Sequence, residues 1–122
     1  MFELVVKSAF AAAHRLREYH GDCERLHGHN WEVEVRLAAP GVNALGMVLD
    51  FREVKRHLQA VVGELDHQYL NDLPAFRERN PTTEHVAETI CAGLAGRLPE
   101  GVTVRSVSVW ESPGCGVAYT PD

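Results

Sequence analysis

The sequence predicts an α+β fold in which two helices lie on one face of a four-stranded antiparallel sheet. Three observations support this class. Residues near both ends alternate between apolar and polar, the middle carries two apolar stripes at helical spacing, and Pro, Gly and Asn separate these segments. The order strand, strand, helix, helix, strand, strand does not build a doubly wound parallel sheet, in which helices alternate with strands. We therefore expect a two-layer ββααββ arrangement in one domain, residues 1–122.

Two alternating segments near the N-terminus predict the first pair of strands. Residues 2–12 place apolar side chains mainly at even positions, and His14 lies on the same face if the extended backbone continues. Residues 27–38 alternate as well, with four apolar residues on one face and charged residues on the other. His27 and His29 share the parity of the apolar positions. Three histidines are therefore expected on one face of a hairpin.

Each predicted helix begins at a capping residue that is followed by an apolar stripe. Asp50 is a good N-cap for a helix whose apolar positions fall within residues 51–65, and this helix ends near Asp66-His67. The second helix opens at Pro81-Thr82-Thr83-Glu84 and carries its core stripe over residues 86–98. Both stripes would pack on the apolar face of the sheet.

The C-terminal residues predict the last two strands. Residues 102–111 are rich in valine, and residues 114–120 form a second short strand across a Pro113-Gly114 turn. The opposite face of the sheet carries charged residues and should meet solvent or the charged lumen of an assembly. A four-stranded sheet also leaves unpaired edges, and pairing between chains would protect them.

The composition excludes several classes of function. The chain is 45% hydrophobic and 24% charged, with no apolar run near the roughly 20 residues that cross a membrane. A net charge of −5, with 12 Lys and Arg scattered singly, argues against a nucleic-acid partner. The three cysteines form no CxxC pair, so neither a disulfide framework nor a cysteine zinc site is indicated. Since no secretory signal is visible, we expect a cytoplasmic protein with a small-molecule partner.

The pattern His27-Gly28-His29 indicates a metal site. Two imidazoles on one strand face can reach one ion, and His14 approaches them if the first two strands pair. Three nitrogen ligands suit zinc and leave its fourth position open for water or substrate, as in a catalytic site. A His-x-His pair also occurs on surfaces and in cores without a metal, so spacing alone leaves the metal site open. His20 in a polar loop and His57 in the first helix are given no role, and His85 is interpreted as a surface residue.

Six ordered segments together resemble the 6-pyruvoyl-tetrahydropterin synthase family. They are Ala12-Ala13-His14, Cys23-Glu24-Arg25-Leu26-His27-Gly28-His29-Asn30, Gly46-Met47-Val48-Leu49-Asp50-Phe51, Leu65-Asp66-His67-Gln68-Tyr69-Leu70-Asn71, Pro81-Thr82-Thr83-Glu84 and Val109-Trp110-Glu111-Ser112. The three residues between Cys23 and His27 resemble the bacterial branch, 6-carboxy-5,6,7,8-tetrahydropterin synthase, which serves biosynthesis of queuosine and other 7-deazapurines. In the pyruvoyl-forming branch this interval is usually longer.

The resemblance implies a fold, a substrate and a set of roles. The fold is the tunnelling fold, in which small sheets join into barrels as trimers or hexamers with active sites at subunit interfaces. The substrate is 7,8-dihydroneopterin triphosphate. The implied roles are zinc binding by His14, His27 and His29, acid/base chemistry by Cys23, Asp66 and His67, and binding of the pterin by Glu111, with added contacts from Thr82 and Thr83.

Physical arguments accompany several of these roles. A cation near Cys23 would lower the pKa of the thiol and favour the thiolate as a base. Glu111 projects from an apolar face, and its carboxylate can accept two adjacent donors of a pterin together. Thr82 and Thr83 serve equally well as helix caps, which we place first. Asp66 and His67 need not face each other, and their partners can lie across a subunit interface.

The expected reaction yields 6-carboxy-5,6,7,8-tetrahydropterin with release of acetaldehyde and triphosphate. The alternatives are a 6-pyruvoyl-tetrahydropterin product, a folate-pathway product formed by side-chain cleavage, or a non-catalytic pterin-binding module. Glu24 keeps the folate alternative open, because relatives in that pathway use a glutamate in this motif. Arg15, Arg17 and Arg25 are candidates for binding the triphosphate. Cys91 is expected to pack in the core, and Cys115 has no assigned role.

Overall fold

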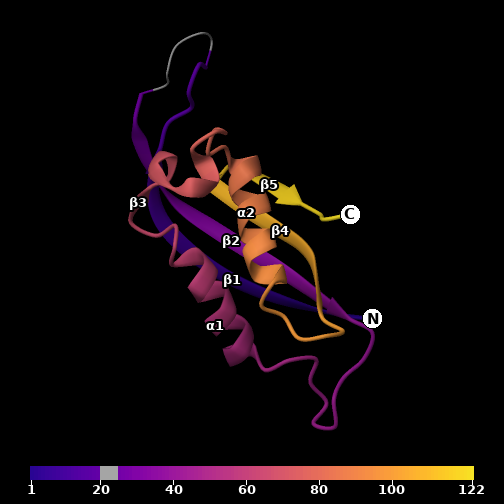
Figure 1. The fold of residues 1–122 in the computed structure, drawn as a ribbon. Helices are drawn as coiled ribbons and strands as arrows, with labels where there is room; N and C mark the ends of the chain where they lie inside the picture. The colour runs from indigo at the N-terminus through magenta and orange to yellow at the C-terminus, as the bar shows by residue number, and fades with distance from the viewer. Residues whose placement is uncertain (20–24) are drawn as a thin grey trace.

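The computed structural model describes residues 1–19 and 25–122, and its architecture is the expected α+β class (Figure 1). Both helices lie on the same face of a five-stranded sheet. The strand order within the described residues is β3-β1-β2-β4-β5. The elements are β1 (Phe2–His14), β2 (His27–Ala39), α1 (Phe51–Val62), β3 (Gln68–Tyr69), α2 (Thr83–Ala95), β4 (Thr103–Ser112) and β5 (Cys115–Tyr119), with two short 3-10 turns at Leu70–Asp72 and Pro74–Phe76.

Strand β3 is the difference from the four strands expected. It pairs in parallel with β1, whereas the other pairs are antiparallel. Two hydrogen bonds attach the residues just before β3 to β1. His67 N–H donates to Ala11 O at 2.6 Å, and Ala11 N–H donates to Asp66 Oδ1 at 2.9 Å. A two-residue strand is too short for alternation to reveal, so only these tertiary bonds define it.

The helix starts agree with the predicted caps, and the helix ends come earlier than the apolar stripes. The Asp50 side chain accepts a hydrogen bond from Arg52 N–H at 2.8 Å, as an N-cap does. α1 ends at Val62, but Leu65 in the following turn is still buried in the core. α2 likewise ends at Ala95, and Leu98 beyond it packs partly buried against the core. The apolar stripes therefore predicted correctly that Leu65 and Leu98 pack against the core, although both residues lie beyond the ends of the helices.

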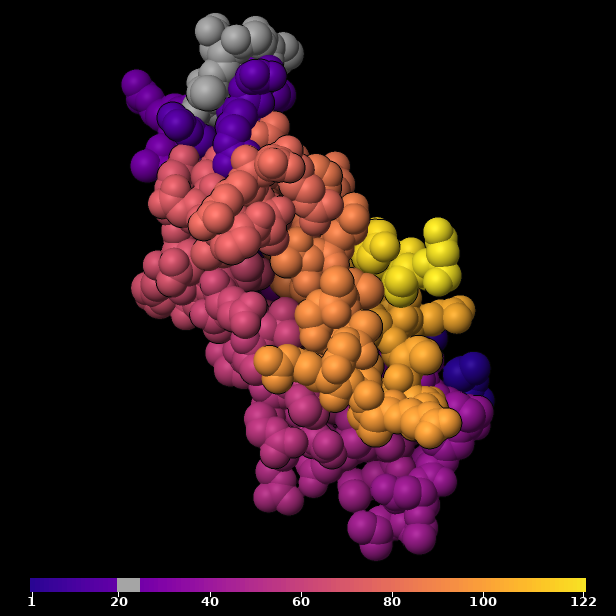
Figure 2. Space-filling model, in the orientation of Figure 1, coloured from indigo at the N-terminus to yellow at the C-terminus, as the bar shows by residue number. Residues whose placement is uncertain are grey.

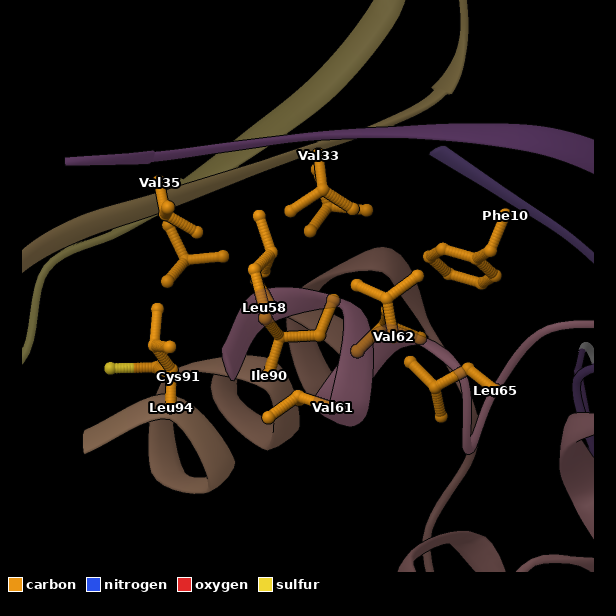
Figure 3. Close-up of a cluster of buried hydrophobic side chains, with 14 of the residues drawn as sticks. Phe10, Val33, Val35, Leu58, Val61, Val62, Leu65, Ile90, Cys91 and Leu94 are labelled. Atoms are coloured by element: carbon orange, nitrogen blue, oxygen red, sulfur yellow. The ribbon is translucent and has the colours of Figure 1, made fainter. Parts of the chain in front are cut away.

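The two helices and the sheet share one hydrophobic core (Figure 3). Side chains of α1 and α2 meet the inward-facing valines of β2, and Cys91 packs among them as expected. At one end of this core, Trp31 is fully buried and stacks on Phe10, with 5.6 Å between the ring centroids. Each buried aliphatic side chain contributes about 1.5–3 kcal/mol. The core thus holds the sheet rigid next to the histidines of β1 and β2.

The two faces of the sheet differ in chemistry. The helices cover one face, and their surface forms the side of the molecule seen in Figure 2. The other face is charged, as predicted, with Lys7 Nζ 4.0 Å from Glu34 Oε1 and Arg36 Nη1 3.8 Å from Glu3 Oε1. Neither helix in the described part of the chain has the length and apolar character to cross a membrane.

Candidate metal centre

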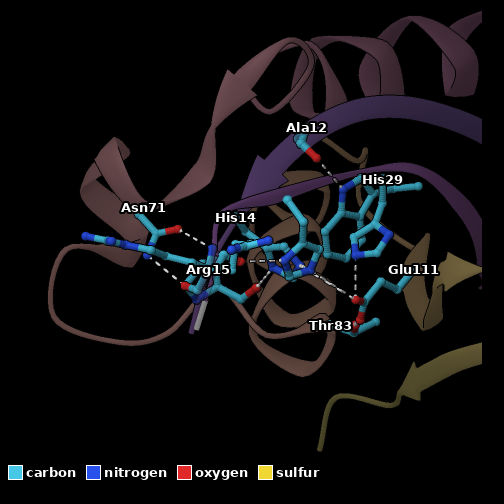
Figure 4. Close-up of polar contacts among 11 residues, drawn as sticks. Ala12, His14, Arg15, His29, Asn71, Thr83 and Glu111 are labelled. Atoms are coloured by element: carbon cyan, nitrogen blue, oxygen red, sulfur yellow. Dashed lines mark hydrogen bonds and ion pairs between the residues drawn. The ribbon is translucent and has the colours of Figure 1, made fainter. Parts of the chain in front are cut away.

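Three histidines, His14, His27 and His29, converge at one end of the β1–β2 hairpin, and Figure 4 labels His14 and His29. The antiparallel register pairs His14 directly with His27 and places His29 opposite Ala12. The rings of His14 and His29 both pack edge-on against buried Trp31, at centroid distances of 4.9 and 5.5 Å. The indole N–H of Trp31 donates to Ala12 O at 3.2 Å, which fixes the ring in place. The face that strand parity predicted is therefore the face on which the histidines meet.

Hydrogen bonds to carbonyl groups orient two of the three rings. His14 Nδ1 lies 2.8 Å from Pro81 O, and His27 Nδ1 lies 2.9 Å from Arg25 O. A carbonyl oxygen only accepts, so each Nδ1 carries a proton, and in the neutral form of such a ring Nε2 presents a lone pair. The two Nε2 atoms are 3.0 Å apart. Two lone pairs at this distance repel each other unless a proton or a metal ion lies between them.

His29 supplies the third nitrogen. Its Nε2 atom is buried and lacks a hydrogen bond of good geometry, although Glu111 Oε1 lies 2.7 Å away. Burial is the main cause that lowers the pKa of His29, and the neighbouring His14 and His27 lower it further while Glu111 opposes them. A lowered pKa favours the neutral form of the ring, which is the form that binds metals.

Glu111, on β4, completes the cluster. Its Oε1 atom also lies 3.6 Å from His14 Nε2 and 3.9 Å from His27 Nε2. Its other oxygen, Oε2, accepts a hydrogen bond from Thr83 Oγ1 at 2.9 Å. The family resemblance implies that this carboxylate binds the pterin, and in the structure it lies among donors of the kind that bind metals. The parity of Glu111 along its strand indicated the correct face of the sheet, but it did not indicate that the carboxylate approaches the histidines.

The four side chains fit a metal ion. Among the described residues, one atom each from His14, His27, His29 and Glu111 lies within 4.8 Å of the others. Imidazole nitrogen and carboxylate oxygen are ligands that zinc and other first-row divalent metals accept. The opposed lone pairs and the buried His29 nitrogen would both be satisfied by a cation at their centre. Hydrogen bonds from the outer ring nitrogens are the usual support of metal-binding histidines.

The neighbouring threonines have different positions. Thr82 caps α2, because its side chain accepts a hydrogen bond from His85 N–H at 3.1 Å. Thr83 is buried and donates to Glu111 instead. His85 is half-buried rather than a surface residue as interpreted from the sequence, and its Nδ1 lies 2.6 Å from Asn80 O. Of the two, only Thr83 contacts the cluster.

Asp66 and His67 form a pair apart from the histidine cluster. His67 Nδ1 lies 3.0 Å from Asp66 Oδ2, so the adjacent side chains do face each other within one chain. The Ala11 N–H bond lowers the pKa of Asp66, and His67 adds to this effect. His67 borders an open pocket of about 560 Å³, which is also lined by Ala13, Gly28 and the cluster residue His29. The pair therefore lies at a pocket that the histidine cluster also borders.

The cysteine predicted as a base, Cys23, lies outside the described residues, as do Glu24 and His20. Cys115 is exposed on β5. Of the three candidate arginines, Arg17 uses its guanidinium to donate to two backbone carbonyls, at 3.1 and 3.2 Å. The side chains of Arg15 and Arg25 are exposed.

A family model described as 6-pyruvoyl tetrahydropterin synthase matches residues 3–122. The chain belongs to this family. Its fold is shared with the 6-pyruvoyl tetrahydropterin synthase of Caenorhabditis elegans, at a TM-score of 0.87 and 23% identity over 99% of this chain and 96% of that one. The two-layer tunnelling fold expected of the family is therefore confirmed.

Two curated proteins that are similar to this chain are named for different reactions. A 6-carboxy-5,6,7,8-tetrahydropterin synthase of Synechocystis sp. is 38% identical, covering 98% of this chain and 93% of its own. A dihydroneopterin monophosphate aldolase of Pyrococcus furiosus is 35% identical, covering 93% of both chains. As a member of this family, the protein is an enzyme of the lyase type.

The groups that orient the three histidines could not be recognised from the sequence. The Pro81 carbonyl left no signal, because every residue carries one. Asn71 lies within a motif noted from the sequence, and Asn80 directly precedes another, yet neither was assigned a role. Trp31 was assigned only to the apolar face, although its indole supports two of the histidines.

Proposed function

We propose that the protein binds Zn²⁺ through His14, His27 and His29 and converts 7,8-dihydroneopterin triphosphate to 6-carboxy-5,6,7,8-tetrahydropterin, with release of acetaldehyde and triphosphate. The product would enter biosynthesis of queuosine and other 7-deazapurines. The convergence of three ring nitrogens, two of them held by carbonyl groups on their outer side, is the observation that carries the proposal. The name and 38% identity of the Synechocystis relative support the choice of reaction.

Zinc would supply Lewis acidity that stabilises negative charge on a substrate oxygen and so acidifies the adjacent carbon. The proposed roles of Glu111 and Thr83 follow from the number of protein ligands that zinc would have. Three protein ligands leave an open position for substrate, whereas Glu111 as a fourth ligand would close the site in the manner of a structural zinc. Glu111 would therefore bind the amino group and ring nitrogen of the pterin. Thr83 would hold its Oε2 atom in place for this task.

Asp66 and His67 would form a proton-transfer pair. The contact of Nδ1 with Asp66 leaves Nε2 of His67 as the atom that exchanges a proton with substrate. The Ala11 N–H bond keeps Asp66 ionised, and an ionised carboxylate stabilises the imidazolium when His67 takes up a proton. Cys23 is proposed as the second acid/base group.

The position of this pair supports a homo-oligomer. The His67 side chain is 81% exposed and borders an open pocket. An acid/base group needs shielding from bulk water and access to the substrate, and both would come from a second copy of the chain. We propose a trimer or hexamer in which one domain per chain, residues 1–122, contributes to sites at the subunit interfaces.

The test is incubation of the zinc-loaded protein with 7,8-dihydroneopterin triphosphate, followed by identification of the pterin and an assay for acetaldehyde. The expected result is 6-carboxy-5,6,7,8-tetrahydropterin with one acetaldehyde per turnover. A 6-pyruvoyl product would contradict the proposed branch, and no conversion of any pterin would contradict the proposed function.

A second candidate is side-chain cleavage by an aldolase. The Pyrococcus furiosus relative with this name matches 93% of the chain at 35% identity, which favours the candidate specifically. Incubation with dihydroneopterin monophosphate separates the two proposals. Faster conversion of the monophosphate than of the triphosphate would favour the aldolase.

A further inference from the structure

Two asparagine side chains pair with the backbone of the segment that follows His14. Arg15 N–H donates to Asn71 Oδ1 at 3.0 Å, and Asn71 Nδ2 donates back to Arg15 O at 2.9 Å. Two residues further, Arg17 N–H donates to Asn80 Oδ1 at 2.7 Å, and Asn80 Nδ2 donates to Arg17 O at 3.1 Å. Each carboxamide therefore binds both polar groups of one residue, as a neighbouring strand would.

The first asparagine is also tied to the segment from its own backbone. Asn71 is 7% exposed, and its carbonyl accepts a hydrogen bond from Arg17 Nη2 at 3.1 Å. Arg17 Nη1 donates to Arg79 O at 3.2 Å, next to the second asparagine. The Arg17 guanidinium thus links the segment that contains Asn71 to the segment that contains Asn80.

The second asparagine connects this structure to the ring of His14. Asn80 directly precedes Pro81, whose carbonyl oxygen lies 2.8 Å from His14 Nδ1. The Asn80 carbonyl lies 2.6 Å from His85 Nδ1, which ties the segment just before Pro81 to the first turn of α2. His14 is consequently held from both sides, through the backbone of the residue after it and through its outer ring nitrogen.

We propose that Asn71 and Asn80 are positioning residues of the metal centre. Together they hold His14 at the angle that directs its Nε2 atom at the partner histidines. Only a carboxamide offers a donor and an acceptor with the spacing needed to satisfy one residue's N–H and C=O together. An aspartate of the same size accepts but does not donate, and it would set a negative charge against the carbonyl oxygen. The proposal rests on the proposed function only in its use of the three-histidine metal site.

The affinity of the folded protein for Zn²⁺ tests this proposal. The variants Asn71→Asp and Asn80→Asp would be compared with wild type by competition against a zinc chelator. Loss of groups that orient metal-binding histidines typically costs 10–100-fold in affinity, so we expect each variant to bind about tenfold more weakly. The control is Asn43→Asp, because Asn43 Oδ1 accepts from Leu45 and Met47 N–H groups in a remote loop and aspartate accepts the same bonds. It should bind within about twofold of wild type.

A second measurement uses the metal-free wild-type protein. Hydrogen exchange of the Arg15 and Arg17 amides should be slow, since both donate to the asparagines. Fast exchange of both amides would overturn the proposal even if the buried Asn71→Asp variant fails to fold. Unchanged zinc affinity in folded Asn80→Asp would also overturn it.

The outcomes separate this proposal from the proposed function. Wild-type protein that binds no Zn²⁺ would remove both the metal centre and the positioning role. Tight zinc binding that weakens in the asparagine variants, without turnover of any pterin, would remove the proposed reaction and uphold the positioning role.

Discussion

Replacement of Thr83 by valine tests whether the hydroxyl group orients Glu111 for the pterin. Valine has nearly the same shape, so Thr83→Val removes the donor to Glu111 Oε2 with little change in packing of this 7% exposed side chain. A hydrogen bond to a charged group contributes about 1.5–3 kcal/mol. If the bond acts in the transition state, kcat/KM should fall about 10- to 150-fold, because each 1.4 kcal/mol is about tenfold.

The matched control is the same substitution one residue earlier. Thr82→Val removes the N-cap bond to His85 N–H, which should cost about 1 kcal/mol of stability and leave kcat/KM of the folded enzyme near wild type. Steady-state kinetics at saturating zinc and thermal unfolding would be measured for both variants. The reasoning fails if Thr83→Val keeps kcat/KM within about twofold of wild type, or if Thr82→Val loses as much activity.

Three further predictions concern the ligands and the acid/base pair. Glu111→Gln should retain one zinc per chain by metal analysis and lose most activity; loss of the metal would show that Glu111 is a ligand. His27→Ala should be depleted of zinc in the same analysis, whereas His57→Ala should not, and equal depletion would refute the ligand set. The folded-state pKa of Asp66 is below its ordinary value of 3.8, so its contribution to stability is present above pH 3.8 and is lost as the pH falls further. Asp66→Asn keeps an acceptor for Ala11 N–H and should lose less stability than wild type on acidification below that pH; parallel acid-unfolding curves would contradict this.

Local patterns were sufficient to predict most elements of the fold. Alternation identified the long strands β1 and β2, because one of their faces is buried over many residues. Asp50 and the segment Pro81-Thr82-Thr83-Glu84 located the helix starts, since capping depends on a few neighbouring residues, and the structure shows that Thr82 is the cap of the second helix. Strand β3 left no such pattern, because two residues cannot show a period and its place depends on bonds to β1.

The sequence by itself determined which face carries His14, His27 and His29. Side chains of a strand alternate with a period of two, so parity placed the three rings on one face, and the pairing of β1 with β2 brings them together. Six ordered motifs also resembled one family, and the family match over residues 3–122 confirms this resemblance.

Only the tertiary structure decided what surrounds those rings. Strand parity gives a face and not the element packed against it, so the approach of Glu111 to the histidines and its bond with Thr83 could not be derived from spacing. The supports of His14 come from segments more than 50 residues away along the chain, through the Pro81 carbonyl and the carboxamide of Asn71. Such bonds depend on how separate elements pack in three dimensions, so local sequence patterns do not predict them.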